Sequence, residues 1–348
     1  MKSIVHFFVL LGLFWAPAAP SAWGRAAGPT FSGTFLQLWN AHAGWSGQQW
    51  QDLLASMRAI GVTEIVVQWS VDGIAPVHDD AQRVGPLRPA LEKVLRAAHD
   101  QHMRVTLGLV HDREYWEKIK GDPEAVRRYF HQLCRVSLAT AADVARLDPD
   151  RAALSGLYIP QEIDDQSWLE PARQAELLLF LKNLRAGLRT LAPDLPVAVS
   201  GFSNGYAAPE ALEGLWRHIL MQSGIDRVLF QDGVGVHKLR EQEVGLFFHA
   251  VARAAASAGR LFTPVVETFT QVDGEPLNQK PFRAVPAQLA RLQRQLASAG
   301  AAPHAGIVAF SLPEYCSPMG GEQAKALYAA YKDHYRPAAT VPPGPDGK

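Results

Sequence analysis

The stretch GLYIPQEIDD, residues 156–165, begins as an apolar run and ends in the carboxylates Glu162, Asp164 and Asp165. A short apolar run bounded by turn residues predicts a buried strand. A carboxylate drawn toward a core loses its hydration at a cost of several kcal/mol unless it gains partners. The stretch therefore indicates a fold in which a buried strand opens directly onto a polar site.

Other short runs rich in β-branched and aromatic residues predict further strands. With 156–162 they make eight, and they cover residues 34–39, 62–69, 103–109, 195–201, 226–232, 261–267 and 305–311. Amphipathic periodicity of the helical type occupies the gaps between them. Strands that alternate with helices in this way predict βα units and a parallel sheet.

Helix start and stop signals agree with this alternation. Residues 46–61 have Ser46 as a candidate N-cap and Gly61 as a stop, 123–146 follow an Asp-Pro pair, and 321–335 form a last helix. Eight βα units match an α/β fold of the (β/α)8 TIM barrel type, which takes about 250 residues plus insertions. We expect a single barrel domain over residues 30–336. A doubly wound open sheet is the alternative, although no GxGxxG turn follows the first strand.

The composition of the chain indicates no particular class of charged binding partner. Of 348 residues, 48% are hydrophobic and 20% are charged, with 34 basic residues against 34 acidic ones. This balance argues against a nucleic-acid partner or an anionic membrane surface. The two cysteines, Cys134 and Cys316, lie in unrelated segments, and we expect two free thiols.

The two ends of the chain differ from the rest. Residues 1–24, MKSIVHFFVLLGLFWAPAAPSAWG, have one Lys, an apolar run and then small residues, which is the plan of a secretory signal peptide. We therefore expect a periplasmic or secreted protein without stable membrane insertion after cleavage, while an uncleaved anchor remains the alternative. Residues 337–348 are rich in Pro and Gly and predict a disordered tail.

Two glutamates are expected to point into the barrel mouth. Reactive groups of such barrels lie at the carboxyl ends of the strands, and successive side chains in a strand alternate between faces. In the fourth strand Leu157 suits the helix layer, so Glu162 points inward. In the seventh strand Phe262 and Val266 suit the helix layer, so Glu267 also points inward.

A pair of carboxyl groups is what glycoside hydrolysis needs. One protonates the leaving oxygen while the other stabilises or attacks the oxocarbenium-like centre, and a separation of about 5 to 5.5 Å marks the retaining mechanism. Acids at the ends of the fourth and seventh strands face each other across a barrel mouth. A solvated or ion-paired role for both glutamates is the structural alternative.

The motifs PQEID and VVETF, which hold Glu162 and Glu267, resemble those of the clan of retaining glycoside hydrolases with (β/α)8 barrels. The stretch around residues 34–69 is similar to a domain-of-unknown-function family of secreted bacterial barrels thought to act on glycans. It reads GTFLQLWNAHAGWSGQQWQDLLASMRAIGVTEIVVQW. The resemblance covers residues 33–335. It implies Glu162 as general acid/base and Glu267 as nucleophile. Gln161 departs from the clan, which has Asn before its acid/base.

The remaining polar and aromatic strand ends are candidates for binding a sugar, because sugar rings stack on aromatic faces and their hydroxyls bond polar groups. The three Trp residues among them are candidate platforms, whereas Trp50 and Trp216 fall within helices and are expected in the core. Asp164 is either a neighbour that raises the pKa of Glu162 or a loop cap. The candidates are Gln37, Trp39, Gln68, Trp69, His111, Gln161, Asp164, Trp168, Ser200, Asn204, Gln231, Asp232, His237, Ser311 and Glu314.

No metal site or cofactor is predicted. The histidines are scattered, without HExxH or CxxC spacing; His111 and His237 could instead bond sugar hydroxyls or orient a carboxylate. The residues favour an exported retaining glycoside hydrolase whose partner is a carbohydrate. A non-catalytic glycan-binding barrel that assists polysaccharide export or processing is the alternative, and a metal-dependent barrel enzyme is a third. The oligomeric state stays open.

Overall fold

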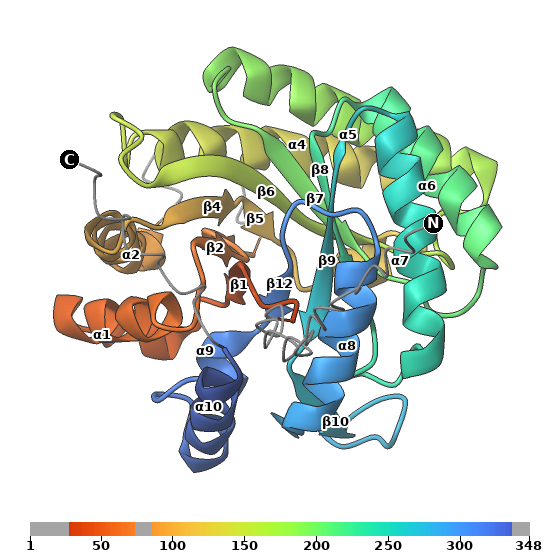
Figure 1. Cartoon of the computed structure of the whole chain (residues 1–348). Helices are drawn as coiled ribbons and strands as arrows, with labels where there is room; N and C mark the ends of the chain where they lie inside the picture. Colours follow the sequence, from red (N-terminus) through yellow and green to blue (C-terminus); the bar gives the residue numbers. More distant parts are fainter. Residues whose placement is uncertain (1–27, 74–84, 336–348) are drawn as a thin grey trace, which may run out of the picture.

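The computed structural model describes residues 28–73 and 85–335 (Figure 1). The predicted signal peptide, 1–24, and the predicted tail, 337–348, lie outside the described residues.

Eight parallel strands form a closed barrel in the order β1-β12-β9-β8-β7-β6-β4-β2. This confirms the predicted (β/α)8 TIM barrel, and each barrel strand falls within or overlaps one predicted run. The strands are β1 (Gly33–Leu36), β2 (Glu64–Val67), β4 (Arg104–Gly108), β6 (Leu154–Ile163), β7 (Val197–Gly201), β8 (Arg227–Gln231), β9 (Leu261–Glu267) and β12 (Val308–Phe310).

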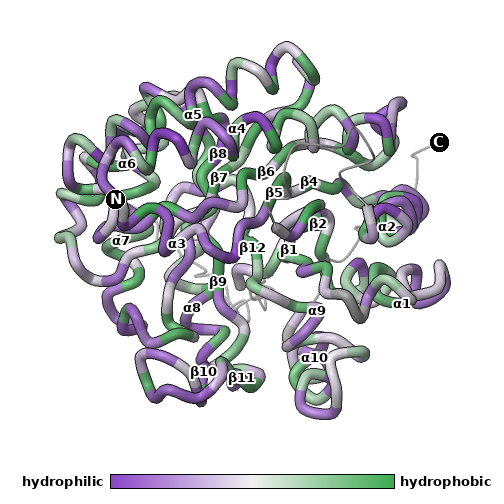
Figure 2. Tube along the Cα trace, turned by 180° about the vertical axis from the view of Figure 1, so that it is seen from behind, coloured by the Kyte–Doolittle hydropathy of each residue, from purple (hydrophilic) through white to green (hydrophobic). Residues whose placement is uncertain are grey.

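Helices surround the barrel on all sides in the view of Figure 1. Figure 2 shows hydrophobic and hydrophilic residues alternating along these helices, as expected for one face on the sheet and one in water. They are α1 (Gly47–Arg58), α2 (Arg88–Asp100), α3 (Tyr115–Lys118), α4 (Pro123–Ala145), α5 (Pro171–Leu191), α6 (Pro209–Ser223), α7 (Glu241–Ser257), α8 (Leu289–Ala301), α9 (Leu312–Tyr315) and α10 (Glu322–His334), with short 3-10 turns η1 (Asn40–Gly44) and η2 (Gly85–Leu87).

Side-chain alternation sorts the strands into an inner and an outer layer, as predicted. Leu157, Phe262 and Val266 belong to the large core between sheet and helices. A smaller cluster fills the barrel interior and consists of Phe35, Val66, Tyr158, Ala198, Leu229, Val265 and Val308. Trp50 and Trp216 are fully buried in the outer core, as expected.

Capping residues delimit the helices where the sequence predicts. The Ser46 hydroxyl accepts a hydrogen bond from the Gln49 amide at the start of α1, and the Gln49 side chain accepts one from the Ser46 amide. This reciprocal pair satisfies two amides that the first helical turn leaves without partners. Asp122 caps α4 in the same way through the amide of Ala125.

The barrel closes where β1 pairs with β12, with Gly33 opposite Val308 and Thr34 opposite Ala309. The Thr34 hydroxyl accepts a hydrogen bond from the Leu312 amide at 2.9 Å. The closure therefore joins segments 275 residues apart and fixes the start of α9 against the first strand.

Two small sheets extend the carboxyl end of the barrel. β3 (Val71–Asp72) pairs with β5 (Val110–His111), and β10 (Phe269–Asp273) pairs with β11 (Arg283–Pro286) as an antiparallel hairpin. β3 and β5 follow barrel strands β2 and β4, and the β10-β11 hairpin follows β9. The hairpin follows β9 after one residue, so its position is tied to that of Glu267.

In the described part of the chain, no helix is long and apolar enough to span a bilayer. Cys134 and Cys316 are both free thiols, as expected, and Cys316 is buried.

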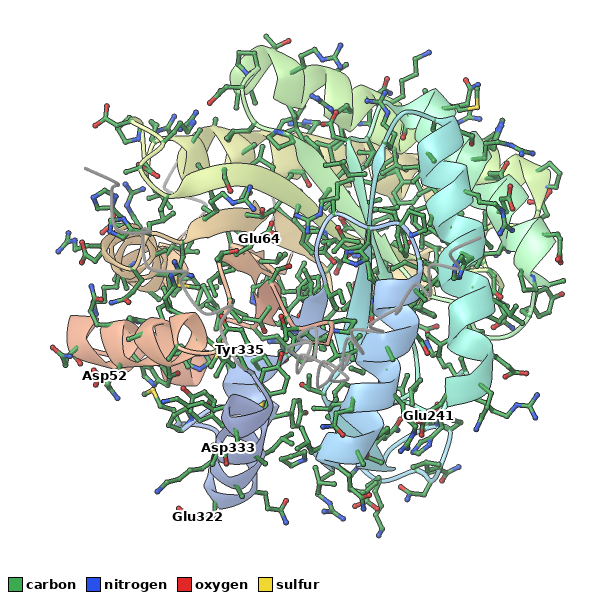
Figure 3. The ribbon with its side chains drawn as sticks, in the orientation of Figure 1. Asp52, Glu64, Glu241, Glu322, Asp333 and Tyr335 are labelled. Carbon is green, nitrogen blue, oxygen red and sulfur yellow. The ribbon has the colours of Figure 1, made fainter. Side chains whose placement is uncertain are left out.

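The amino ends of the strands hold an ion pair within the barrel. Glu64 of β2 accepts hydrogen bonds from Arg227 of β8 at 2.6 Å and from Thr106 of β4 at 3.1 Å. Figure 3 shows Glu64 within the barrel, whereas Asp52, Glu241 and Glu322 lie on peripheral helices. Burial alone would raise the pKa of Glu64, but the charge and hydrogen bonds of Arg227 and Thr106 outweigh it and lower the pKa.

We expect Glu64→Gln to lower the free energy of unfolding by about 3 kcal/mol, because it leaves the Arg227 charge buried without a counter-ion. Because the pKa of Glu64 is lower in the folded protein than in the unfolded chain, its ionised form stabilises the fold at a pH above the ordinary carboxyl pKa. This contribution is lost as the pH falls through the pKa of Glu64 in the folded protein. The difference between variant and parent in urea unfolding should therefore shrink in acid. Glu322→Gln on exposed α10 should change stability by less than about 0.5 kcal/mol. Equal stability of Glu64→Gln and the parent at neutral pH would contradict this.

Candidate active site

A cavity of about 430 Å³ lies at the carboxyl end of the barrel. Its wall contains both polar groups and aromatic rings. Its lining consists of Gln37, Trp39, Gln68, Glu162, Phe202, Gln231, Gly233, Val236, Lys238, Glu267, Phe269, Phe282, Phe310, Glu314 and Tyr315.

Glu162 reaches the cavity from the end of β6. Its Oε1 accepts a hydrogen bond from the Gln231 side-chain amide at 2.7 Å, and its backbone carbonyl accepts one from the Tyr115 hydroxyl at 2.8 Å. Burial raises the pKa of Glu162, and the charge of Asp164 also raises it. The hydrogen bond from Gln231 and the charges of Lys238 and His111 lower this pKa, but not enough to offset burial. The net shift favours a protonated carboxyl group, which is the form that can donate a proton.

Glu267 ends β9 and is only 3% exposed. Its Oε2 accepts a hydrogen bond from the Val236 backbone amide at 3.0 Å. A Cβ atom on Gly235 would lie 2.5 Å from the Phe269 carbonyl oxygen and 2.8 Å from Glu267 Oε2. Only glycine therefore allows the backbone to approach this carboxyl group so closely.

Asp232 lies fully buried beneath Glu267. Its Oδ1 accepts a hydrogen bond from the Glu267 amide at 3.3 Å, and its Oδ2 accepts one from Gln295 at 2.6 Å. Burial and then the Asp232 charge raise the pKa of Glu267 to about 8, against the amides of Val236 and Gly235 and the charge of Lys238. The structure thus gives Asp232, a predicted sugar ligand, a position behind the cavity where it holds β9.

Several predicted binding residues do line the cavity: Gln37, Trp39, Gln68, Gln231 and Glu314. Gln37 donates to Gln68 at 2.7 Å, and Glu314 accepts a hydrogen bond from the hydroxyl of Ser311. Burial raises the pKa of Glu314 to about 7. Ser311 itself does not line the cavity and acts on it only through Glu314.

The structure buries three predicted residues that do not line the cavity, although Trp69 packs edge-to-face on Trp39 of the cavity wall. Trp168 is fully buried against Phe130 on α4, and Trp69 is 2% exposed and stacks on His111. Gln161 donates to the Val110 carbonyl at 2.9 Å, because side-chain alternation turns it away from the mouth when Glu162 faces it. Neither Trp69 nor Trp168 can offer a free ring face to a sugar in this arrangement.

Four other predicted residues bond neighbouring strands and loops and do not line the cavity. His111 pairs with Asp72, and His237 bonds the Gln271 carbonyl at 3.0 Å. Ser200 bonds Tyr158 at 2.6 Å, and Asn204 donates to Asp164 at 2.9 Å. Each of these bonds joins one strand or loop at the mouth to another.

Asp164 has both of the roles expected, because it adds to the raised pKa of Glu162 and its Oδ1 accepts a hydrogen bond from the Ser167 amide at 2.7 Å. Asp165 caps a loop. Asp165 accepts hydrogen bonds from the Ser203 hydroxyl and from the backbone amides of Asn204, Tyr206 and Ala207. These bonds fix the segment after β7.

Sequence reasoning missed the contribution of the β8 loop, residues 232–240. This loop brings the Val236 amide and the Lys238 side chain to the cavity. The signal was the glycine spacing in QDGVGVHK, which indicates a backbone that approaches another group. The aromatic wall from Phe269, Phe282, Phe310 and Tyr315 is not among the candidate platforms named from the sequence, which were Trp residues.

Among the described residues, no group of three or more His, Cys, Asp or Glu side chains is arranged to hold a metal ion. The cavity instead offers the carboxyl groups of Glu162, Glu267 and Glu314, amide side chains and aromatic faces. Such a set can transfer protons, attack an electrophilic carbon or bind hydroxyl groups.

Residues 31–321 match the family model described as Domain of unknown function (DUF4434), and the chain belongs to this family. The Uncharacterized protein YbcH of Escherichia coli (strain K12) is 29% identical over 255 residues, which cover 72% of this chain and 80% of that protein.

Solved structures of similar shape share the barrel fold. A candidate alpha-L-fucosidase from Bacteroides thetaiotaomicron has a TM-score of 0.70 and 18% identity, covering 94% of this chain and 99% of that one. An endo-beta-1,4-mannanase from Thermotoga petrophila has a TM-score of 0.55 and 12% identity, covering 82% of this chain and 68% of that one.

We expect Gly235→Ala to lower the free energy of unfolding by about 1 to 3 kcal/mol, because the added methyl group must push the β8 loop off Phe269 and Glu267. The matched control is Gly245→Ala in α7, where a Cβ would meet nothing within 4 Å. That control should be neutral or stabilising, since alanine favours helices. Denaturant unfolding of both variants measures the difference, and equal effects would disprove the close approach.

Proposed function

We propose that this member of the DUF4434 family is a glycoside hydrolase with Glu162 and Glu267 as its catalytic pair. The observation that carries the proposal is that two glutamates from β6 and β9 line one cavity, and neither forms an ion pair with a described residue. Buried carboxyl groups without a direct ion-pair partner are costly to stability. Two such groups with raised pKa values in one cavity support a chemical role.

Glu162 is assigned as general acid/base. Its raised pKa and single side-chain donor, Gln231, suit a group that first protonates the glycosidic oxygen and later deprotonates water. Glu267 is assigned as nucleophile and forms a covalent bond to the anomeric carbon when the leaving group departs. Water activated by Glu162 then releases the sugar from Glu267 with net retention.

The raised pKa of Glu267 bears on this assignment. A protonated Glu267 cannot attack, so the reactive form needs Glu267 ionised while Glu162 keeps its proton. The Val236 amide at 3.0 Å favours the ionised form. The same raised pKa favours the alternative function, a glycan-binding barrel in which neutral carboxyl groups only bond hydroxyls.

The cavity wall supports a carbohydrate as the substrate. Trp39 is 45% exposed and Phe282 is 58% exposed, so both leave ring faces for the apolar side of a sugar. The side-chain amides of Gln37 and Gln68 lie in the same cavity and can bond hydroxyl groups. The names of the similar barrels from Bacteroides and Thermotoga, a candidate fucosidase and a mannanase, agree with this class.

An exported location is part of the proposal. It rests on the signal-peptide plan of residues 1–24 alone. Fractionation of the native host with an antibody to the chain tests it, and a purely cytoplasmic signal would contradict it.

We expect Glu267→Gln and Glu162→Gln each to lower kcat/KM on a responsive glycoside by at least about a thousandfold, because each removes a group that acts in the transition state. Both variants should fold normally and still bind the oligosaccharide by calorimetry. Proton NMR of the first-formed anomer tests retention. Full activity of Glu267→Gln would refute the catalytic assignment, whereas glycan binding without turnover by the parent would favour the alternative function.

We expect the pH profile of kcat/KM to be bell-shaped, because the reactive form holds one proton on the pair. Both limbs should lie above the pKa of an ordinary carboxyl group, since burial raises the pKa of Glu162 and of Glu267, the latter to about 8. Initial rates across the pH range measure the limbs. A profile that falls only below pH ~4, as for ordinary carboxylates, would contradict raised pKa values at both sites.

A further inference from the structure

Lys238 brings a positive charge into the acidic part of the cavity. It lines the cavity together with Glu162, Glu267 and Glu314, and its Nζ lies 3.3 Å from the centroid of the Phe202 ring. It forms no ion pair with any residue that the structure describes. The charge therefore faces the cavity and is held by an aromatic face rather than by one carboxylate.

The β8 loop fixes the position of Lys238 through its backbone. The Lys238 amide donates to the Gly233 carbonyl at 2.8 Å, and Gly233 has a φ of +63°, a conformation that favours glycine. The same loop supplies the Val236 amide to Glu267. Lys238 is thus set in place by the turn that also contacts the proposed nucleophile.

We propose that Lys238 is a positioning residue whose charge favours the ionised form of Glu267 that attacks, and that acts on Glu162 at the same time. The inference rests on the proposed function, because it assigns Lys238 a role toward those two glutamates. Its physical basis is that a cation favours the charged form of nearby carboxyl groups, more strongly in a partly desolvated cavity than in water.

Charges from each surrounding element face this region. The acids are Glu162, Asp164 and Asp165 at the end of β6, Asp232 after β8, Glu267 on β9 and Glu314 on α9. The cations other than Lys238 are Arg291 of α8, which donates to the backbone carbonyl of Glu267 at 3.2 Å, and His111 of β5, when protonated.

Among these groups, Lys238 is the one whose charge acts on both glutamates. It lowers the pKa of Glu162 and that of Glu267, in each case against the larger effect of burial. Burial also lowers the pKa of Lys238 itself, while Glu162 and Glu267 oppose that shift. Arg291 acts on the far side of Glu267, where it bonds backbone carbonyls rather than the carboxyl group.

The test compares Lys238→Met, Lys238→Arg and Arg240→Met. Methionine keeps the apolar contact with Phe202 and removes the charge, whereas arginine keeps the charge. Arg240→Met removes one charge from the same loop outside the cavity, since the Arg240 side chain is 79% exposed and pairs with Glu243. All three variants should first be shown to fold by circular dichroism.

The first readout is the pH profile of kcat/KM. Loss of the cation raises the pKa of both glutamates, so in Lys238→Met both limbs should move to higher pH by about one unit. In Lys238→Arg, which keeps the charge, both limbs should lie at the same pH values as in the parent. The same is expected for Arg240→Met. A fall in rate with both limbs in place would overturn the inference and leave Lys238 as a structural or substrate-contacting residue.

The second readout needs no substrate and separates this inference from the proposed function. Carbon-13 NMR titration of the Glu267 carboxyl group, assigned by comparison with Glu267→Gln, should show a higher pKa in Lys238→Met than in the parent. An unchanged Glu267 titration would overturn the role of Lys238 even in an active hydrolase. A shifted titration in a protein that hydrolyses no glycoside would support the electrostatic role and reject the proposed function.

Discussion

The parallel pairing of β1 with β12 closes the barrel, and the position of the site depends on that closure. Glu162 and Glu267 end strands β6 and β9, which are three strands apart in the sheet order. In a flat sheet this offset would separate their strand axes by about 14 Å. Curvature into a closed barrel turns both inner faces toward one axis, so side chains distant in the sequence line one cavity.

Acidic groups at the two ends of the barrel have pKa values that are shifted in opposite directions. At the amino ends, Glu64 has a direct partner in Arg227, and its pKa falls. At the carboxyl ends, Glu162 and Glu267 have amide donors and no ion pair among the described residues, and the pKa of each rises. The first arrangement stabilises the fold, while the second leaves carboxyl groups able to exchange protons.

Much of the fold could be predicted because it follows from short-range rules. The period of two within strands set the inward direction of Glu162 and Glu267, and caps such as Ser46 set helix starts. The surroundings of the pair were harder to predict, because loop paths decide them. Trp168 follows a strand end and yet turns into the core, and Lys238 reaches the cavity only through the backbone turn at Gly233.

The residues that contact the two glutamates are concentrated in one short segment of the chain. Gln231 bonds Glu162, and within the next seven residues the chain supplies Asp232, the Val236 amide and Lys238 around Glu267. A small insertion or deletion there would disturb both carboxyl groups together while leaving them in the sequence. The length and path of this segment therefore decide the geometry of the site as much as the identity of residues 162 and 267 does.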